Sequence, residues 1–453
     1  MHDKKRSIHF IGIGGSGMSG IAELLINLGH NVSGSDMART KVTERLANLG
    51  AKIYIGHAAE NVSGADVVVV SSAVSRDNPE VISAKRQAIP VIMRAEMLAE
   101  LMRLKYGIAV GGSHGKTTTT SLVGSVLLAG KLDPTVVIGG RLNNSGTGAR
   151  LGEGEYLVAE ADESDGSFLK LMPTIAVVTN IDYEHIDHYG SREVLVSTFL
   201  DFINKIPFYG TAIVCIDDDD LRNLMVNYEK RYLSYGFSED ADIRAEDITI
   251  KGESKSFDIL FKGENLGRVE LHLPGRHNVL NALAAVGVGL ELGVPFEAIQ
   301  RGLESFAGVE RRFQFKGERD GVTIIDDYGH HPTEIAATLS AAKEVWPERR
   351  IIAVFQPHRY SRTRDLKGMF TDTFLNSDIL FITPIYSAGE KPIEGIDAST
   401  IVKEAQEGGV DNVTLVKDLD DVVTRLREIT KPGDVVITMG AGDVVKVAGK
   451  YLE

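Results

Sequence analysis

The sequence has few of the features that mark secreted, membrane-bound or nucleic-acid-binding proteins. Its 453 residues include a single cysteine, Cys215, so no disulfide can form within the chain, and this suits the reducing cytoplasm. Acidic residues outnumber basic ones by 63 to 49, and the net charge of −14 argues against nucleic acid or an anionic membrane as a partner. Apolar runs such as residues 67–70 have the length of a strand, which is far too short to cross a bilayer. The basic N-terminus leads at once into a predicted strand and a glycine-rich turn, which argues against a signal peptide.

What the chain does contain is typical of a globular α/β protein. Hydrophobic residues make up 43% and charged residues 25% of the sequence. The length predicts about three domains. Strand-length apolar runs alternate with segments of helical spacing, which predicts parallel sheets covered by helices. Residues 212–216 and 243–269 are predicted instead to form a small antiparallel appendage, since polar and apolar residues often alternate there.

Residues 110–120 predict a phosphate-binding loop between a strand and a helix. In such a unit, backbone N–H groups and the positive end of the helix dipole surround a polyphosphate. Gly112 and Gly115 would let the backbone approach phosphate oxygens closely. Lys116 would place its charge at the β- and γ-phosphates, and the Thr117 hydroxyl would reach Mg²⁺. The alternative is a glycine-rich turn with a solvated lysine.

A second glycine-rich turn lies near the N-terminus. Gly12, Gly14 and Gly17 match the pattern G-x-G-x-x-G between a predicted strand and a predicted helix. The next predicted strand ends on Asp36, about where a dinucleotide-binding fold places its ribose-binding acid. On these residues alone the turn would bind a nucleotide diphosphate, with NAD as the default ligand. The glycines could also serve only the tight turn and the packing of the helix.

Acidic residues crowd the end of a predicted strand in the middle of the chain. Glu160, Asp162, Glu163 and Asp165 follow that strand directly. Acids beside a phosphate loop are the usual way to hold Mg²⁺, and four carboxylates would repel one another without a cation. His185 follows the next strand, at the same predicted sheet edge, which favours a metal or phosphate role. A solvated acidic loop is the alternative.

Three further segments carry polar residues whose roles the pattern leaves open. Residues 139–148 form a Gly/Asn-rich loop that either lines a site or connects two elements. Asn278 and Asn281 lie on one face of a predicted helix and would bind an adenine edge, or serve as a cap and a surface residue. The last third of the chain contains the basic cluster that an anionic ligand would need, formed by Arg311, Arg312, Arg359, Arg362 and Arg364.

Seven segments, in order along the whole chain, together resemble the Mur ligase family of peptidoglycan synthesis. They are residues 12–18 (GIGGSGM), 112–117 (GSHGKT), 160–165 (EADESD), 179–185 (TNIDYEH), 275–281 (GRHNVLN), 326–332 (DDYGHHP) and 356–362 (QPHRYSR).

The resemblance implies an α/β protein of three domains. Residues 1–105 would form a Rossmann-like domain that binds the UDP part of the substrate rather than NAD. Residues 106–310 would form a central P-loop-type domain with a parallel or mixed sheet that binds ATP and Mg²⁺. Residues 311–453 would form a Rossmann-like domain that binds the amino acid and closes over the site.

The resemblance also implies the reaction and the residues that serve it. Within the family it points to the branch that joins L-alanine to the lactyl carboxylate of UDP-N-acetylmuramate through an acyl phosphate, in the cytoplasm, as a monomer or weak homo-oligomer. The ATP-binding residues would be Gly112, Ser113, His114, Gly115, Lys116, Thr117, Thr118, Asn278, Asn281 and Arg311. The UDP-substrate residues would be Gly12, Gly14, Gly15, Ser16, Gly17, Met18, Asp36, Ser71 and Ser72. The amino-acid and carboxylate residues would be Tyr328, His330, His358, Arg359 and Arg362. The metal ligands would be Thr117, Glu160 and His185, with Glu160 preferred to Glu163. Lys116, His330 and Arg359 would be catalytic, with His330 as the candidate general base.

The chain departs from the pattern of its relatives at a few positions. Val110 stands where the general phosphate-loop signature has glycine, so the loop is of a shorter type, and Ser113 replaces the more usual threonine. No lysine occurs between Ile186 and Asn204, where ligases of later steps carry a lysine that becomes carbamylated. That difference fits the alanine-adding branch.

Other functions compete with this interpretation. A ligase that attaches a tripeptide to the same sugar during recycling is the nearest alternative. A dinucleotide-dependent oxidoreductase would explain the first glycine turn but not the loop at Lys116. A regulatory nucleotide-binding protein without catalysis would not explain the histidines and arginines of the last third.

Overall fold

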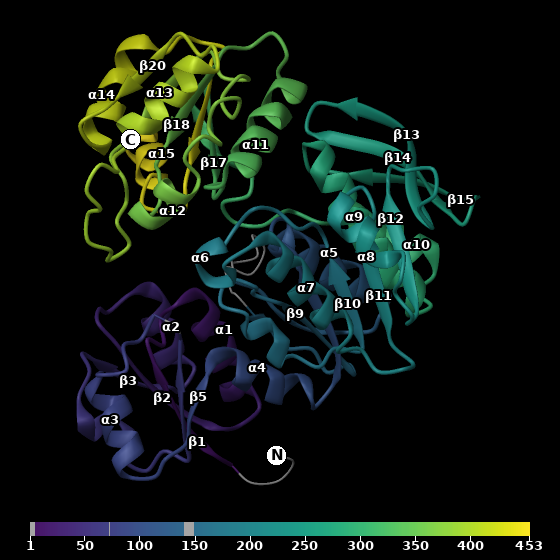
Figure 1. Ribbon diagram of the computed structural model, residues 1–453, viewed down its shortest axis with the longest axis vertical. Coiled ribbons are helices and arrows are strands. Elements are labelled where there is room, and N and C mark those ends of the chain that lie inside the picture. Colours follow the sequence, from purple (N-terminus) through teal and green to yellow (C-terminus); the bar gives the residue numbers. More distant parts are fainter. Residues whose placement is uncertain (1–4, 72, 140–148) are drawn as a thin grey trace. The chain divides into compact units, whose positions relative to one another are not determined.

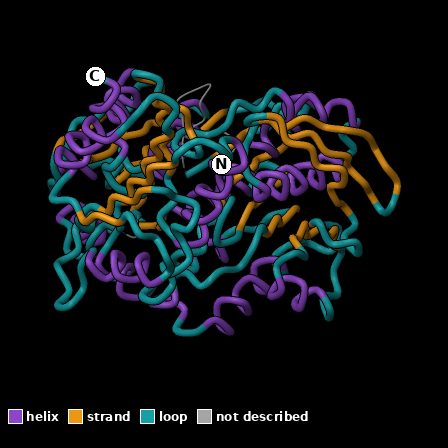
Figure 2. The backbone as a smooth tube through the Cα atoms, turned by 90° about the horizontal axis from the view of Figure 1, so that it is seen from above, coloured by secondary structure: helices purple, strands orange, loops and turns teal. Residues whose placement is uncertain are grey.

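The computed structural model describes residues 5–71, 73–139 and 149–453, and it places them in three sheets that follow one another along the chain (Figure 1). Strands and helices alternate through most of the backbone (Figure 2), as the sequence predicts. The prediction of a three-domain α/β protein is confirmed. The boundaries predicted at 105/106 and 310/311 stay predictions. Ser72 and almost all of the Gly/Asn-rich loop at 139–148 lie outside the described residues.

The first sheet has five strands in the order β3-β2-β1-β4-β5, and its adjacent strands are parallel. Its strands are β1 (Ser7–Ile11), β2 (Asn31–Asp36), β3 (Lys52–Ile55), β4 (Val67–Val70) and β5 (Val91–Met93). Its helices are α1 (Ser16–Asn27), α2 (Lys41–Asn48), η1 (Ala59–Val62), α3 (Pro79–Arg86) and α4 (Arg94–Met102). The strand order reverses between β1 and β4, which is where doubly wound sheets bind ligands.

The second sheet has ten strands in the order β15-β14-β13-β12-β11-β10-β6-β9-β7-β8. Its strands are β6 (Tyr106–Gly111), β7 (Thr135–Val137), β8 (Ala149–Arg150), β9 (Tyr156–Glu160), β10 (Ile175–Val178), β11 (Thr211–Cys215), β12 (Tyr232–Gly236), β13 (Ile243–Lys251), β14 (Ser254–Phe261) and β15 (Glu264–Leu271). The helices between and after them are α5 (Lys116–Ala129), η2 (Ser167–Lys170), α6 (Ile186–Tyr189), α7 (Arg192–Ile203), α8 (Asp219–Met225), α9 (Arg276–Glu291) and α10 (Phe296–Glu304). Because β6 lies between β9 and β10, three loops with polar residues follow adjacent parallel strands.

The small antiparallel appendage predicted over residues 212–216 and 243–269 is wrong for residues 212–216 and for the way in which residues 243–251 join the sheet. β11 is buried along its whole length and pairs in parallel with both β10 and β12. β13 then continues the same sheet, again in parallel with β12. Polar and apolar residues alternate in β13 to β15 because much of these strands is exposed to solvent, although the strands remain part of the sheet.

The third sheet has six strands in the order β16-β17-β21-β18-β19-β20, all parallel except β16. Its strands are β16 (Gln314–Arg319), β17 (Val322–Asp327), β18 (Ile351–Phe355), β19 (Ile379–Ile382), β20 (Val413–Leu415) and β21 (Val435–Met439). Its helices are α11 (Pro332–Val345), α12 (Tyr360–Asp365), α13 (Ser399–Glu407), α14 (Leu419–Ile429) and α15 (Val445–Leu452). Alternate residues of β18 enter two different cores, Phe355 on one face and Val354 on the other, because successive side chains point to opposite faces.

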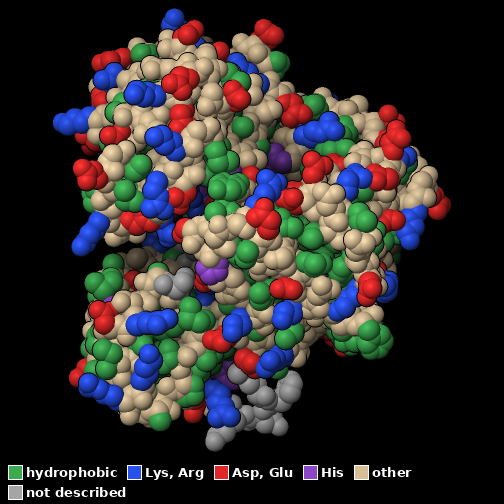
Figure 3. All heavy atoms as spheres, in the orientation of Figure 1, with side chains coloured by type: hydrophobic (Ala, Val, Ile, Leu, Met, Phe, Trp, Pro, Cys, Tyr) green, Lys and Arg blue, Asp and Glu red, His purple; other side chains and the backbone are tan. Residues whose placement is uncertain are grey.

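By its internal contacts the described chain forms two compact units. One consists of Met1–Asp247, Phe257–Val269 and Leu280–Ala307, and the other of Ile248–Ser256, Glu270–Val279 and Gly308–Glu453. None of the described helices has both the length and the apolar character that a bilayer span requires. On the face drawn in Figure 3, Lys and Arg side chains are interspersed with Asp and Glu.

Candidate active site

The predicted phosphate loop connects β6 to α5, and two of its glycines are required by the backbone. Gly112 has φ of +129° and Gly115 has φ of +81°, a region that residues with a side chain rarely adopt. A Cβ at Gly115 would also lie 2.5 Å from Asn281 Oδ1. Helix α5 begins at Lys116, so its free N–H groups face the loop. The geometry is therefore that of an anion-binding turn.

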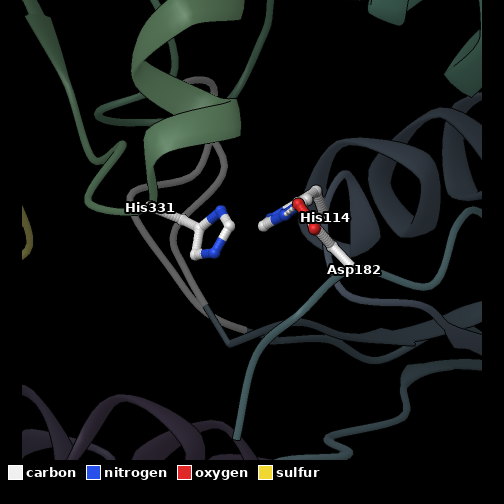
Figure 4. A group of neighbouring side chains, drawn as sticks. All are labelled: His114, Asp182 and His331. Atoms are coloured by element: carbon white, nitrogen blue, oxygen red, sulfur yellow. Dashed lines mark hydrogen bonds and ion pairs between the residues drawn. The ribbon is translucent and has the colours of Figure 1, made fainter. Parts of the chain in front are cut away.

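The segment after β10 supports this loop from the side. The Ser113 N–H donates to Asn180 O at 3.0 Å, and the His114 N–H donates to Asn180 Oδ1 at 2.8 Å. The Asp182 N–H donates to Ser113 Oγ at 2.8 Å. The His114 ring reaches back, with Nε2 lying 2.8 Å from Asp182 Oδ2 (Figure 4). We did not assign Asn180 and Asp182 from the sequence; their place after a strand next to the loop was the available signal.

Lys116 is held by oxygen atoms on several sides. Its Nζ donates to Gly112 O at 2.6 Å, to Ser113 O at 2.8 Å and to Glu163 Oε1 at 2.9 Å. Burial disfavours the ammonium form, yet Glu163 and Glu184 outweigh that effect and raise the pKa of Lys116 above its usual value. The lysine is thus a fixed cation at the loop, and the alternative of a solvated lysine is excluded by its contacts.

The acids after β9 separate into two neighbouring groups. Glu160 accepts a hydrogen bond from Thr117 Oγ1 at 2.6 Å and another from the Gly139 N–H. Glu163 pairs instead with Lys116, and His185 Nε2 lies 3.9 Å from its Oε1. Of the three predicted metal ligands, the structure brings Thr117 and Glu160 together and places His185 with Glu163.

His185 belongs to a three-residue group that the sequence did not single out. Glu163, Glu184 and His185 each offer a donor atom within 4.8 Å of the others. Burial raises the pKa of Glu163 to about 7 against the pull of the Lys116 ammonium, and the nearby Asp162 and Glu184 carboxylates add to the rise. Carboxylate and hydroxyl oxygens are the donors that Mg²⁺ prefers, so this group of acids fits a divalent cation. The preference for Glu160 over Glu163 as a ligand stays a prediction.

The two asparagines of the segment at 275–281 are both buried in the structure. Asn281 Oδ1 accepts a hydrogen bond from Thr119 Oγ1 of α5 at 3.1 Å and lies beside Gly115. Asn278 Nδ2 donates to Pro274 O at 2.7 Å. Neither residue is a surface residue, which excludes that alternative. Contact with adenine stays a prediction.

The first glycine loop is held by the end of β2. Gly12, with φ of +78°, donates its N–H to Ser35 O at 2.8 Å, and the Gly14 N–H donates to Asp36 Oδ2 at 2.8 Å. Asp36 therefore fixes the loop in this structure. Met18 is 2% exposed, so a ligand would reach only its backbone.

Arg94 is a cation beside this loop that sequence reasoning missed. A Cβ at Gly17 would lie 2.9 Å from Arg94 Nη1, which places the guanidinium at the start of α1. The same group forms an ion pair with Asp162 at 2.8 Å. Its position at the first residue of α4, directly after β5, was the signal for a residue at the ligand-binding edge of the sheet.

In the third sheet, predicted residues gather after β17 and β18. The His330 and His358 ring centroids lie 6.2 Å apart, and Tyr328 and His330 lie 5.6 Å apart. Arg362 Nη1 lies 3.2 Å from His358 Nδ1. Burial lowers the pKa of His358 to about 3, with Arg362, His330 and Arg359 adding to the effect. His358 is thus a neutral imidazole at physiological pH and a poor proton acceptor, which leaves His330 as the general-base candidate.

Two neighbours of this cluster come from the loop after β19, which sequence reasoning left without a role. Tyr386 stacks on His358 with ring centroids 5.7 Å apart. Glu390 accepts hydrogen bonds from the Ser361 N–H at 3.1 Å and from Ser361 Oγ at 2.6 Å, at the start of α12. Their place after a parallel strand next to β18 was the available signal.

Arg311 and Arg359 are two further predicted site residues, and each has a structural feature of its own. The Arg311 guanidinium pairs with Asp326 at 2.8 Å and donates to Gly440 O at 2.7 Å, so its side chain is engaged within its own domain. Arg359 has φ of +69°, an unusual backbone for arginine, and its N–H donates to Tyr386 O at 2.8 Å. Strained residues of this kind cluster at functional sites.

Comparison with known proteins identifies the family to which each part of the chain is similar. The domain described as "Mur ligase family, catalytic domain" matches residues 7–106, the "Mur ligase middle domain" matches residues 110–289, and the "Mur ligase, glutamate ligase domain" matches residues 311–442. A UDP-N-acetylmuramate–L-alanine ligase of Geobacter sulfurreducens is 57% identical over 453 residues, covering 100% of this chain and 98% of the relative.

Solved structures show the same architecture. The crystal structure of the UDP-N-acetylmuramate–alanine ligase of Thermotoga maritima has a TM-score of 0.84 at 28% identity, covering 98% of both chains. A murein peptide ligase of Psychrobacter arcticus has a TM-score of 0.74 at 24% identity, covering 99% of this chain and 98% of that one, which shows a shared fold. Matches to all three domains and to full-length relatives thus agree, and the chain belongs to the Mur ligase family.

Proposed function

We infer that this protein is an ATP-dependent ligase that joins L-alanine to the lactyl carboxylate of UDP-N-acetylmuramate and releases ADP and phosphate. The observation that carries this conclusion is the 57% identity over the full chain to a UDP-N-acetylmuramate–L-alanine ligase. The phosphate loop with its half-buried, ion-paired Lys116 supports it, because acyl activation needs a phosphoryl donor bound at such a loop.

The reaction follows from the weak electrophilicity of a carboxylate. A carboxylate oxygen of the substrate attacks the γ-phosphorus of ATP, the bond to the β-phosphate oxygen breaks, and ADP leaves. The amine of alanine then attacks the acyl carbon, passes through a tetrahedral intermediate, loses a proton and expels phosphate. Lys116 offsets the charge that builds between the two anionic reactants. His330 is the residue we assign to take up the amine proton.

Mg²⁺ fits the acids at the loop. Thr117, Glu160 and His185 would hold it, with Glu163 and Glu184 as the neighbouring carboxylates. When bound, the ion neutralises phosphate charge and orients the transferred group. The loop is held by its hydrogen bonds, Lys116 is fixed and Glu163 is buried before any ion or nucleotide binds.

The other substrates are assigned by domain. The glycine loop after β1 would bind the diphosphate of the UDP-sugar through Gly12 to Met18, and Asp36, Ser71 and Ser72 are the further residues that we assign to this substrate. Tyr328, His358, Arg359 and Arg362 would bind alanine and the substrate carboxylate. A single buried cysteine and nucleotide substrates fit a cytoplasmic enzyme.

A phosphate-release assay tests this function against its alternatives. With UDP-N-acetylmuramate and ATP present, we expect release to depend on L-alanine and to be much slower with glycine, L-serine or a tripeptide. Release that depends on the tripeptide alone would assign the protein to the recycling ligases. An absorbance change of a nicotinamide cofactor, with no phosphate release, would assign it to the oxidoreductases.

A further inference from the structure

A buried carboxylate outside the predicted active site contacts the strand end that holds the first glycine loop. Glu80 is the second residue of α3, and its side chain is 0% exposed. Ser35 Oγ–H donates to its Oε2 at 2.6 Å, while Asn61 Nδ2 donates to its Oε1 at 2.5 Å and the Ala58 N–H donates to the same oxygen at 3.4 Å. His57 Nδ1 lies 3.3 Å from Oε2. Both oxygen atoms are therefore occupied by donors.

These donors keep the carboxylate charged. Burial opposes ionisation, but the His9 ring, with Nε2 3.7 Å from Oε2, and the hydrogen bonds from Ser35 and Asn61 outweigh it and lower the pKa of Glu80 to about 2. A buried carboxylate is costly to keep unless it is fully bonded, and here it connects β1, β2, the loop after β3 and α3 through its partners. Such a group holds its neighbours in one arrangement.

Ser35 connects Glu80 to the glycine loop. Its hydroxyl is held by Glu80, and its carbonyl oxygen accepts from the Gly12 N–H at 2.8 Å and from the Ile13 N–H at 3.0 Å. The next residue, Asp36, accepts from the Gly14 N–H at 2.8 Å. Two consecutive residues at the end of β2 thus bind three consecutive amides of the loop.

We propose that Glu80 is a positioning residue for UDP-substrate binding, which acts through Ser35 and Asp36 to set the orientation of the loop at Gly12 to Gly14. The proposal rests on the proposed function of that loop. Glu80 does not touch the substrate, and its contribution is to fix the strand end that holds the loop amides. The remaining N–H groups of the turn and of the start of α1 then face the diphosphate in a preset direction.

Replacing Glu80 by glutamine tests this chain of contacts. The carboxylate accepts on both oxygens, whereas an amide has one acceptor oxygen. Glutamine can keep the Asn61 contact only by turning its NH₂ group towards Ser35 Oγ, which reverses the hydrogen bond that holds the Ser35 hydroxyl. We expect Glu80→Gln to raise the KM for UDP-N-acetylmuramate about tenfold, since a misplaced binding group costs ~10–100-fold. The KM values for ATP and L-alanine, and kcat at saturation, should stay within about twofold.

Two further variants make the result decisive. Glu60→Gln makes the same change at an exposed position on η1 and should alter no KM. Ser35→Ala removes only the hydroxyl that donates to Glu80, and it should raise the KM for UDP-N-acetylmuramate to a smaller extent than Glu80→Gln. This variant still tests the proposal if Glu80→Gln does not fold. Titration calorimetry of UDP-N-acetylmuramate without ATP should show the same weakening.

The outcomes separate the inference from the function on which it rests. If the unaltered protein shows no phosphate release that depends on UDP-N-acetylmuramate, the proposed function fails. If it is active but Glu80→Gln leaves that KM unchanged, or raises all three KM values equally, the positioning role is overturned and Glu80 is a structural residue. If only Ser35→Ala can be purified, an unchanged KM in that variant overturns it.

Discussion

Lys116→Met removes the charge at the phosphate loop while keeping most of the side-chain volume. Lys116 Nζ has three oxygen partners at 2.6 to 2.9 Å, so the ammonium is already fixed at the loop to which we assign the γ-phosphate. Loss of one preorganised electrostatic group costs about 3–4 kcal/mol of transition-state stabilisation, or about 10²–10³-fold in kcat. We expect a loss of at least that size.

The variant should still fold, because Glu163, the ion-pair partner of Lys116, can become neutral by binding a proton. Breaking a buried ion pair costs about 3–5 kcal/mol when the remaining charge stays unpaired. The pKa of Glu163 is already raised to about 7 with Lys116 present, and without the lysine it would rise further. Glu163 would then bind a proton at neutral pH, and the loss of stability should be below that range.

The assay compares turnover with binding of the UDP substrate. We measure phosphate release at saturating substrates and the dissociation constant of UDP-N-acetylmuramate by calorimetry. The dissociation constant should stay within about twofold, since the first glycine loop belongs to a different sheet. Lys170→Met, at an exposed lysine of the same domain, should change neither quantity. Parallel loss of turnover and UDP-substrate affinity in Lys116→Met, or retention of turnover, would refute this division of labour.

Three other outcomes follow from the structure. Glu160→Gln should raise the Mg²⁺ concentration for half-maximal turnover at least tenfold, because one carboxylate is lost beside Thr117. Glu155→Gln, at an exposed position, should leave that concentration unchanged. The same Mg²⁺ requirement in both variants would contradict the metal role of Glu160. For Glu80, a pKa of about 2 in the folded state against 4.5 in the unfolded state corresponds to about 3 kcal/mol of folding free energy. This contribution is present above pH ~4.5 and is lost as the pH falls towards 2. Denaturant unfolding of Glu80→Gln and the unaltered protein should therefore differ most near pH 7 and converge in acid; a constant difference would argue against this. His358 should titrate well below pH 5 by NMR, because burial and nearby cations disfavour its charged form, and an ordinary pKa near 6.5 would show that its site is open to water.

Local features of the site could be predicted from the sequence because their geometry depends on neighbouring residues. Gly112, Gly115 and Lys116 lie in the predicted strand–loop–helix unit, and the positive φ angles explain why glycine is needed there. The three-domain α/β fold was predictable for a related reason: each strand and helix has its own periodicity. The appendage prediction was wrong for β11 and for the pairing of β13, because alternation of polar and apolar residues indicates the exposure of a strand, whereas its partners depend on the whole sheet.

The division of roles among the acids could not be predicted in the same way. Glu160 and Glu163 are three residues apart after one strand, and spacing does not decide which of them meets Thr117 and which meets Lys116. The structure places Glu160 on Thr117 and Glu163 on Lys116 because β9 runs beside β6 and the chain turns after it. Arg94 was missed because its place directly after β5 is its only signal, and a single arginine there belongs to no motif.

The sequence by itself determined the class of the protein: an acidic α/β chain with one cysteine, two glycine-rich loops and seven segments of the Mur ligase family in order. Only the tertiary structure decided which charges are buried and what they touch. Glu80 shows the difference, since in sequence it is an ordinary acid in the first turn of a helix. The sheet buries it completely and surrounds it with donors from other elements, and burial and long-range contacts are properties that no local pattern contains.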